Sequence, residues 1–301
     1  MRLACAIVLL LGLVLPARAE QEQGWGFAGN FSGSSNSDGT VMKVAPMLDY
    51  NFNSHFQTYA GLPFYIVNPS STAASTTTTT TPTTSTSGGF VSGIGNAFIG
   101  GRLIVNSDAI NYSSTLELTG PTGDKSHGFS TGRATADWTN RFSHRFDSFT
   151  PFGSLGLANT ISDTNFFVRP FTSLGLVTHF EGGGTFDISD HVRINGSGYA
   201  IGAVGDQRII SKEFKRQISS LVSSGTTGTS GRGSSSAGTN PNRVFNTQTE
   251  TVVSAQAADD HGVSTWIGVS PGQGDFYIGY SRSMHYDYNT LFFGMGFRIG
   301  K

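Results

Sequence analysis

The chain has 301 residues, of which 13% are charged, and carries a formal net charge of −1 at pH 7. Charge this sparse and balanced does not provide the basic patch that nucleic-acid binding requires, so we expect no nucleic-acid partner. The single cysteine, Cys5, lies in the expected leader, which excludes disulfides, cysteine nucleophiles and thiolate metal sites from the mature protein.

The first 19 residues have the layout of a secretory signal peptide. A basic start at Arg2 precedes an apolar run from Leu3 to Leu15 and an A-x-A cleavage site that ends at Ala19. The apolar run is shorter than the roughly 20 residues of a spanning helix, so we expect cleavage rather than a retained anchor. The mature chain, 20–301, has no longer apolar run, and is expected either to be soluble outside the cytoplasm or to cross a membrane as strands.

From Gly24 onwards, apolar and polar residues alternate with a period of two, in segments of about ten residues separated by turn residues. In one such segment Val44 and Leu48 share an apolar face, while Lys43 and Asp49 lie on the other. Bacterial single-chain barrels have an even number of strands, and twelve segments fit this pattern. They are 24–33, 40–52, 56–67, 93–105, 110–119, 129–142, 149–158, 169–182, 192–204, 263–270, 275–285 and 290–300.

The connections between these segments alternate between short and long, as in outer-membrane barrels with short periplasmic turns and long extracellular loops. A soluble β-sandwich, the alternative fold, gives no reason for this alternation. The short connections are Asn53–His55, Asn106–Ala109, Ser143–Ser148, Ser189–His191 and Pro271–Gly274. The long ones include 68–92, 119–128 and 205–262.

Two of the long connections have a biased composition. The loop at 68–92 contains six consecutive threonines, and the loop at 205–262 contains a Gly/Ser-rich stretch at 223–240; both have too little apolar content to order themselves. Apolar residues at helical spacing predict a short amphipathic helix in the second loop, either on the barrel rim or folded into the lumen as a constriction. These residues are Ile210, Phe214, Ile218 and Leu221.

The sequence therefore predicts an all-β fold, a transmembrane antiparallel up-and-down β-barrel of about 12 strands. The expected location is the outer membrane of a Gram-negative bacterium, with the lipid bilayer as the barrel's partner. Outward aromatic residues near strand ends, such as Tyr50, Trp138 and Phe142, are expected to anchor it at the lipid interfaces.

Five segments rich in glycine and aromatic residues carry a family resemblance. They are GIGNAFIGGRLIV (93–105), SFTPFGSLGLANT (148–160), VRPFTSLGLVTHFEGG (168–183), GSGYAIGAVGDQ (196–207) and FFGMGFRIGK (292–301). They resemble a family of transporter-like outer-membrane barrels that is associated with the meta-pathway of phenol degradation. The resemblance implies a barrel related to transporters of small, often aromatic compounds.

Charged residues on the inward faces are the candidate functional residues. Most are expected near the periplasmic end, as a girdle whose arginine excess favours anionic solutes or holds a plug. Alternatively, these charges only fill and rigidify the lumen, where unpaired charge is costly. The lumen-lining candidates are Asp49, Arg102, Arg133, Asp137, Arg141, Glu181, Arg193 and Arg298.

Motifs for catalysis and metal binding are weak. Two G-x-S-x-G matches, around Ser130 and Ser270, precede no helical pattern, and Ser130 falls on a face expected to contact lipid. The histidines lack metal-binding spacing, although Asp259, Asp260 and His261 are adjacent. We therefore expect no catalytic residue, no cofactor, no metal and no enzymatic activity.

The expected function is a narrow channel or uptake protein for small, possibly aromatic or apolar, molecules. Side chains fill the interior of an eight-stranded barrel, whereas general porins have sixteen or more strands and an aqueous channel. Twelve strands lie between these two cases, which predicts a narrow lumen. A structural or surface-display barrel with a closed lumen is the alternative. The sequence leaves the oligomeric state open.

Overall fold

The computed structural model describes residues 23–69, 90–125, 127–161, 172–210, 250–270 and 274–300. The expected leader, the threonine run, the Gly/Ser-rich stretch and most of the predicted helix lie outside these ranges; of the helix residues, only Ile210 is described, at the end of a strand. Within the described ranges, no helix is long and apolar enough to span a bilayer.

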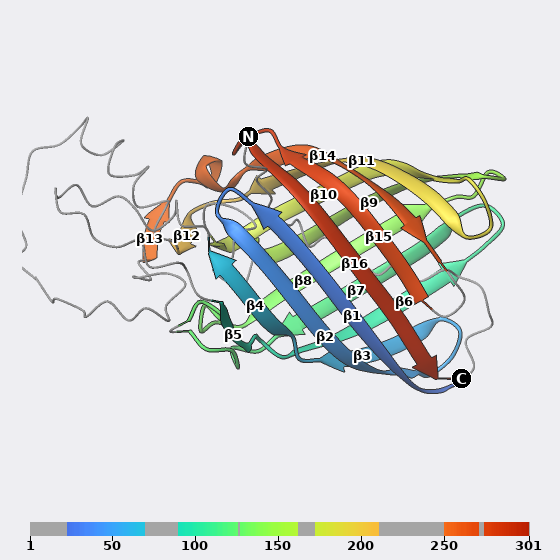
Figure 1. Ribbon diagram of the computed structural model, residues 1–301, viewed down its shortest axis with the longest axis horizontal. Coiled ribbons are helices and arrows are strands. Elements are labelled where there is room, and N and C mark those ends of the chain that lie inside the picture. The colour runs from blue at the N-terminus through green and yellow to red at the C-terminus, as the bar shows by residue number, and fades with distance from the viewer. Residues whose placement is uncertain are drawn as a thin grey trace, which may run out of the picture.

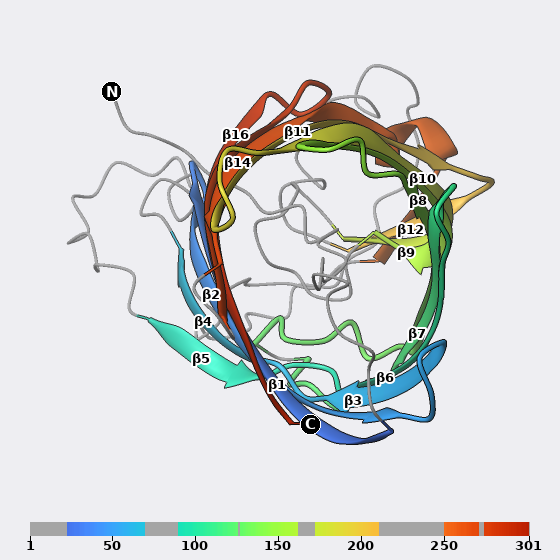
Figure 2. The ribbon, with the colours of Figure 1, turned by 90° about the vertical axis from the view of Figure 1, so that its right-hand side faces the viewer.

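The described strands form one antiparallel sheet that closes on itself, because β1 pairs with both β2 and β16. Figure 2 shows the resulting ring, and Figure 1 shows the strands sloping across its long axis. The strands are β1 (Gly24–Asn36), β2 (Gly39–Asn51), β3 (Phe56–Gly61), β4 (Phe64–Pro69), β5 (Val91–Ile94), β6 (Phe98–Asn106), β7 (Asn111–Thr119), β8 (Thr135–Ser143), β9 (Phe149–Thr160), β10 (Thr172–Asp187), β11 (Val192–Ala203), β12 (Gln207–Ile210), β13 (Glu250–Val253), β14 (Asp260–Val269), β15 (Gly274–Ser283) and β16 (Tyr288–Gly300).

These segments occupy twelve positions around the barrel, which confirms the predicted number of strands. Four positions are each shared by two segments: β3 and β4 both pair with β2, and β11 and β12 both pair with β10. Likewise β5 pairs with β4 while β6 pairs with β3, and β13 pairs with β12 while β14 pairs with β11. Pro63 lies at the first interruption, where its missing N–H cannot continue the ladder.

The two faces of the wall differ in chemistry as predicted. In β2, Val44 and Leu48 are 40% and 50% exposed on the outer face, whereas Asp49 on the inner face is 4% exposed. Apolar side chains this exposed are stable only against lipid, and they recur on the strands all round the barrel. At the short-turn end Trp25, Tyr50 and other outward aromatic residues make edge contacts with one another, as in an interfacial girdle.

The connections confirm the predicted alternation, with two differences. The five short connections join β2–β3, β6–β7, β8–β9, β10–β11 and β14–β15 at one end of the barrel. The strand predicted at 129–142 begins only at Thr135, because residues 120–125 and 127–134 form a loop that is tied to the wall by hydrogen bonds. The connection predicted at 205–262 is not loop throughout, since β12, β13 and a 3-10 helix (Ala255–Ala258) lie within it.

Candidate functional site

The barrel wall brings the predicted charged residues onto one surface, the inner face. The register places Asp49, Arg102, Asp137, Arg141, Glu181 and Arg193 on it. Arg133 instead lies exposed in the β7–β8 loop, because β8 begins after it. Arg298 pairs with Ala28 of β1, and only its backbone is described.

Acidic side chains form a row across neighbouring strands. Glu117 on β7 lies directly opposite Asp137 on β8. Tyr59 donates a hydrogen bond from its hydroxyl to Glu117 Oε2 over 3.0 Å, and Thr139 donates to Asp137 Oδ1 over 2.7 Å. We call Tyr59, Glu117, Asp137 and the neighbouring His179 the acidic cluster.

His179 completes this cluster from β10. Its Nε2 lies 3.3 Å from Asp137 Oδ2, but the two atoms are not aligned for a hydrogen bond, and Nε2 has no other partner. The ring reaches Asp137 across β9 because Gly156 lies between them; a Cβ there would be 2.2 Å from His179 Cε1. The imidazole is therefore held against the wall with one nitrogen unsatisfied.

The two arginines of this wall are packed against aromatic rings. The Arg102 guanidinium lies 5.9 Å from the Tyr59 ring centroid, and its Nε donates to Thr115 over 3.3 Å. The Arg141 guanidinium lies 3.9 Å from the Phe152 centroid and interacts electrostatically with Glu181. Cation–π contacts of this kind fix the arginines along the wall rather than across the lumen.

A second polar group lies on the opposite side of the barrel. Arg193 donates from Nη2 to Asp275 over 2.6 Å and to Ser270 over 2.8 Å, and its guanidinium lies 5.9 Å from the Trp266 ring centroid. The register places Trp266 on the inner face of β14, next to Asn195. This network joins β11, β14 and β15 near their short turns.

The arginine excess predicted for the girdle near the short turns stays a prediction, but it does not extend over the described inner face of β1–β4, β6–β11 and β14–β16 as a whole. Acidic side chains outnumber basic ones there, because several inward acids were not recognised from the sequence. The inward position of Glu117 could have been predicted from the sequence, since this residue lies between Leu116 and Leu118, which both face outward. The inward acids are Asp49, Glu117, Asp137, Glu181, Asp187, Asp260 and Asp275; the inward bases are Lys43, Arg102, Arg141, Arg193 and, by its backbone register, Arg298.

Inward aromatic rings lie over glycines of the adjacent strand. A Cβ at Gly100 would be 2.2 Å from the Tyr59 ring, and one at Gly294 would be 2.1 Å from the Tyr277 ring. Cross-strand pairs of glycine and an aromatic residue protect the glycine backbone and pin the strand register. The glycines therefore allow large rings to lie along the wall.

The β7–β8 loop folds over the inner face at the end with long connections. Phe129, only 1% exposed, packs with Val41, Tyr65 and Val67, all of which are inward residues of β2 and β4. Thr122 receives a hydrogen bond from the Ala97 N–H over 2.7 Å, which ties the loop to the interruption between β5 and β6. The predicted strand at 129–142 placed Phe129 in the wall, because the apolar–polar alternation continues into the loop, so this packing was not predicted.

In the part of the chain that the structure describes, the remaining sequence motifs are not brought together into one site. Ser130 is buried in the β7–β8 loop, not on the lipid face, and its Oγ accepts from the Gly132 N–H. Asp260 faces inward and accepts from Tyr199 and Ser283, whereas His261 lies on the outer face. Among described residues, no group of three or more acidic, histidine or cysteine side chains could hold a metal ion.

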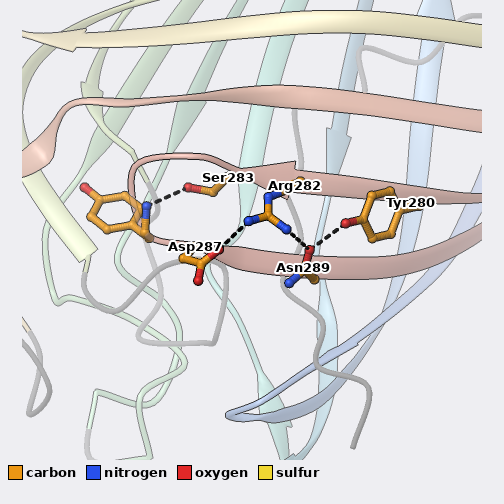
Figure 3. Close-up of polar contacts among 6 residues, drawn as sticks. Tyr280, Arg282, Ser283, Asp287 and Asn289 are labelled. Atoms are coloured by element: carbon orange, nitrogen blue, oxygen red, sulfur yellow. Dashed lines mark hydrogen bonds and ion pairs between the residues drawn. The ribbon is translucent and has the colours of Figure 1, made fainter. Parts of the chain in front are cut away.

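The β15–β16 hairpin is fixed by contacts on the outer side of the rim (Figure 3). Arg282 donates to Asp287 over 2.5 Å and to Asn289 over 3.1 Å, and Tyr280 donates to the same Asn289 oxygen over 2.5 Å. Asp287 adopts a φ of 54°, which the tight turn requires. These contacts stabilise the hairpin that carries the last two strands.

Comparisons with known proteins find relatives by structure only. No family model matches the chain, and no curated protein matches it by sequence. An outer membrane channel from Pseudomonas putida F1 matches with a TM-score of 0.54 and 11% identity, over 95% of this chain and 100% of that chain.

Two further outer-membrane proteins match less well. A loop-deletion mutant of OmpT from Vibrio cholerae has a TM-score of 0.37 and 8% identity, over 92% of this chain and 99% of that chain. OmpF from Salmonella typhi has a TM-score of 0.33 and 7% identity, over 92% and 97%. At 11% identity the channel from Pseudomonas shares the fold with this chain, that of an outer-membrane β-barrel.

Proposed function

We propose that this outer-membrane barrel is a narrow channel that admits small solutes, including aromatic ones. One observation carries the proposal: ionisable groups on the inner face are open to the lumen, and the Asp137 side chain is 42% exposed although it lies inside a closed barrel. Charges that only filled the interior would be buried and fully paired, because isolated buried charge is costly.

Two further features support a narrow channel for small solutes. The inner wall carries Tyr59, Trp266 and Tyr277, which offer flat apolar surfaces among the charged groups. A barrel of twelve strands has a lumen narrower than that of a general porin. Solutes about the size of one aromatic ring fit such a wall better than oligosaccharides do.

Flux through the purified protein tests the proposal. In proteoliposomes we expect osmotic swelling with small neutral solutes such as glycerol and none with a trisaccharide, and in planar bilayers we expect single-channel steps. A heat-modifiable gel shift must first show that the barrel is folded. Folded protein that gives neither swelling nor conductance would overturn the channel proposal.

A barrel with a closed lumen is the second candidate, and the packing of Phe129 inside the mouth is the observation that favours it. On this alternative the barrel has a structural or surface-display role and the charged wall only rigidifies it. Absence of flux in both wild-type protein and a Phe129→Ala variant would favour the closed barrel.

A further inference from the structure

We propose that the inner face of β14–β16 binds small neutral sugars, with the pyranose ring stacked on a row of aromatic side chains. The row consists of Trp266, Tyr277 and Phe292, and we call it the aromatic track. The inference rests on the proposed channel and deepens it, because it names a class of solute that the lumen retains. A pyranose ring is similar in size to an aromatic ring, so it fits a narrow lumen.

The three rings of the aromatic track form one continuous surface across three strands. The Trp266 and Tyr277 ring centroids lie 6.0 Å apart, and those of Tyr277 and Phe292 lie 6.2 Å apart. Each ring lies against a glycine of the wall, so that one face meets the backbone and the other is turned toward the lumen. A Cβ on these glycines would lie at most 2.9 Å from a ring atom; they are Gly268 for Trp266, Gly294 for Tyr277 and Gly279 for Phe292.

The charges that flank the aromatic track on β11 and β14–β16 are compensated. Among the described side chains of this part of the inner face, Asp260 lies toward the long connections, and Arg193 and Asp275 lie toward the short turns. Asp260 accepts hydrogen bonds from Tyr199 and Ser283, and Arg193 is paired with Asp275 over 2.6 Å. The track therefore offers little net charge to an ion and favours neutral solutes.

Polar atoms beside the rings are available for hydrogen bonds with a solute. Among the described residues, none hydrogen-bonds with the indole N–H of Trp266 or the hydroxyl of Tyr277, and neither atom is sealed from the lumen. Ser264 lies two residues from Trp266 on the inner face of β14, opposite Ser197 of β11, and both serines are half-buried. Successive inward side chains of a strand are about 7 Å apart, so a ring stacked on Trp266 brings its own hydroxyls to Ser264.

A sugar uses both features of the aromatic track at once. Aromatic faces carry partial negative charge, which attracts the polarised C–H bonds on the face of a pyranose ring. The sugar hydroxyls both donate and accept, so they match the serine, tyrosine and indole groups beside the rings. An aromatic hydrocarbon would stack on the same rings, but it would displace water from these polar atoms without replacing the hydrogen bonds, which is costly.

Fluorescence of Trp266 tests binding in a way that needs no conductance. The protein has three tryptophans, and Trp25 and Trp138 lie exposed on the outer face, so Trp25→Phe combined with Trp138→Phe leaves Trp266 as the only one. Titration of this folded double variant in detergent with glucose should change the Trp266 emission and saturate. Sorbitol has the hydroxyls without a ring, and tetrahydropyran-2-methanol has the ring with one hydroxyl. Each should bind about tenfold more weakly than glucose, because stacking or several hydrogen bonds are lost.

Single substitutions in the same background locate the site on the aromatic track. Tyr277→Phe keeps the ring and removes the hydroxyl, and should weaken glucose binding about fivefold, as expected for one lost hydrogen bond. Phe292→Leu keeps an apolar side chain without the ring, and should weaken it by about the same factor. The matched control is Tyr280→Phe, because Tyr280 lies on the outer face of the same strand as Tyr277 and donates to Asn289. This control should bind glucose as the double variant does.

The outcomes separate the sugar site from the channel. Equal binding of glucose and either comparison compound would overturn the sugar site. Unchanged binding in both Tyr277→Phe and Phe292→Leu, or an equal loss in Tyr280→Phe, would do the same. Glycerol flux without glucose binding would overturn only the sugar site, whereas glucose binding by a folded protein that shows neither swelling nor conductance would overturn only the channel.

Discussion

At the residue scale, glycines decide where the inward rings lie. Gly294 and Gly296 are both inward residues of β16, but a Cβ at Gly294 would be 2.1 Å from the Tyr277 ring, while a Cβ at Gly296 would meet nothing within 4 Å. We expect Gly294→Ala to push Tyr277 into the lumen, lowering single-channel conductance and costing about 1–3 kcal/mol of stability, as overpacking does. Gly296→Ala is the matched control and should behave like wild type in bilayer recordings and urea unfolding.

The Arg193–Asp275 pair gives a second prediction at this scale. Both side chains are mostly buried, at 19% and 26% exposure, so removal of one partner leaves the other charge poorly solvated. We expect Arg193→Ala to cost about 2 kcal/mol of unfolding free energy, less than for a fully buried pair. In urea unfolding from lipid vesicles, Arg193→Ala combined with Asp275→Ala should be more stable than Arg193→Ala alone; additive losses would contradict this coupling.

At the element scale, the β7–β8 loop covers part of the inner face at the end with long connections. Its packing depends on Phe129, which contacts inward residues of β2 and β4. We expect Phe129→Ala to release the loop, so that single-channel conductance rises and trypsin cleaves the loop at Lys125 faster in intact protein. Phe90→Ala removes a 71% exposed ring of the same size and should leave both measurements unchanged.

At the scale of the whole molecule, stability depends on closure between the first and last strands. β1 and β16 pair over ten residue positions, from Gly26↔Gly300 to Ser35↔Leu291. Truncation before Tyr288 would expose the edges of β1 and β15, and unsatisfied strand edges are not tolerated in lipid. We expect this variant to lose the heat-modifiable gel shift that wild-type protein shows, and retention of the shift would show that closure is dispensable.

The sequence predicted the outward, lipid-facing side chains of the barrel better than the inward ones. Alternation in β2 and β16 is a local pattern, and it predicted which residues face lipid, among them Leu48 and Met295, because a strand turns each successive side chain to the opposite face. The same rule placed Asp49 and Arg102 inward. It failed for Arg133 and Ser130, because local alternation does not reveal where pairing with a neighbour stops.

The sequence by itself determined the barrel class, the number of strand positions, the outward apolar face and the short turns, since all of these follow from period-two patterning and turn residues. Only the tertiary structure decided that Glu117 lies opposite Asp137, that His179 reaches Asp137 over Gly156, and that Phe129 folds into the mouth. These contacts join residues on different strands. Their positions depend on register and closure, which are set by pairing between segments far apart in the chain.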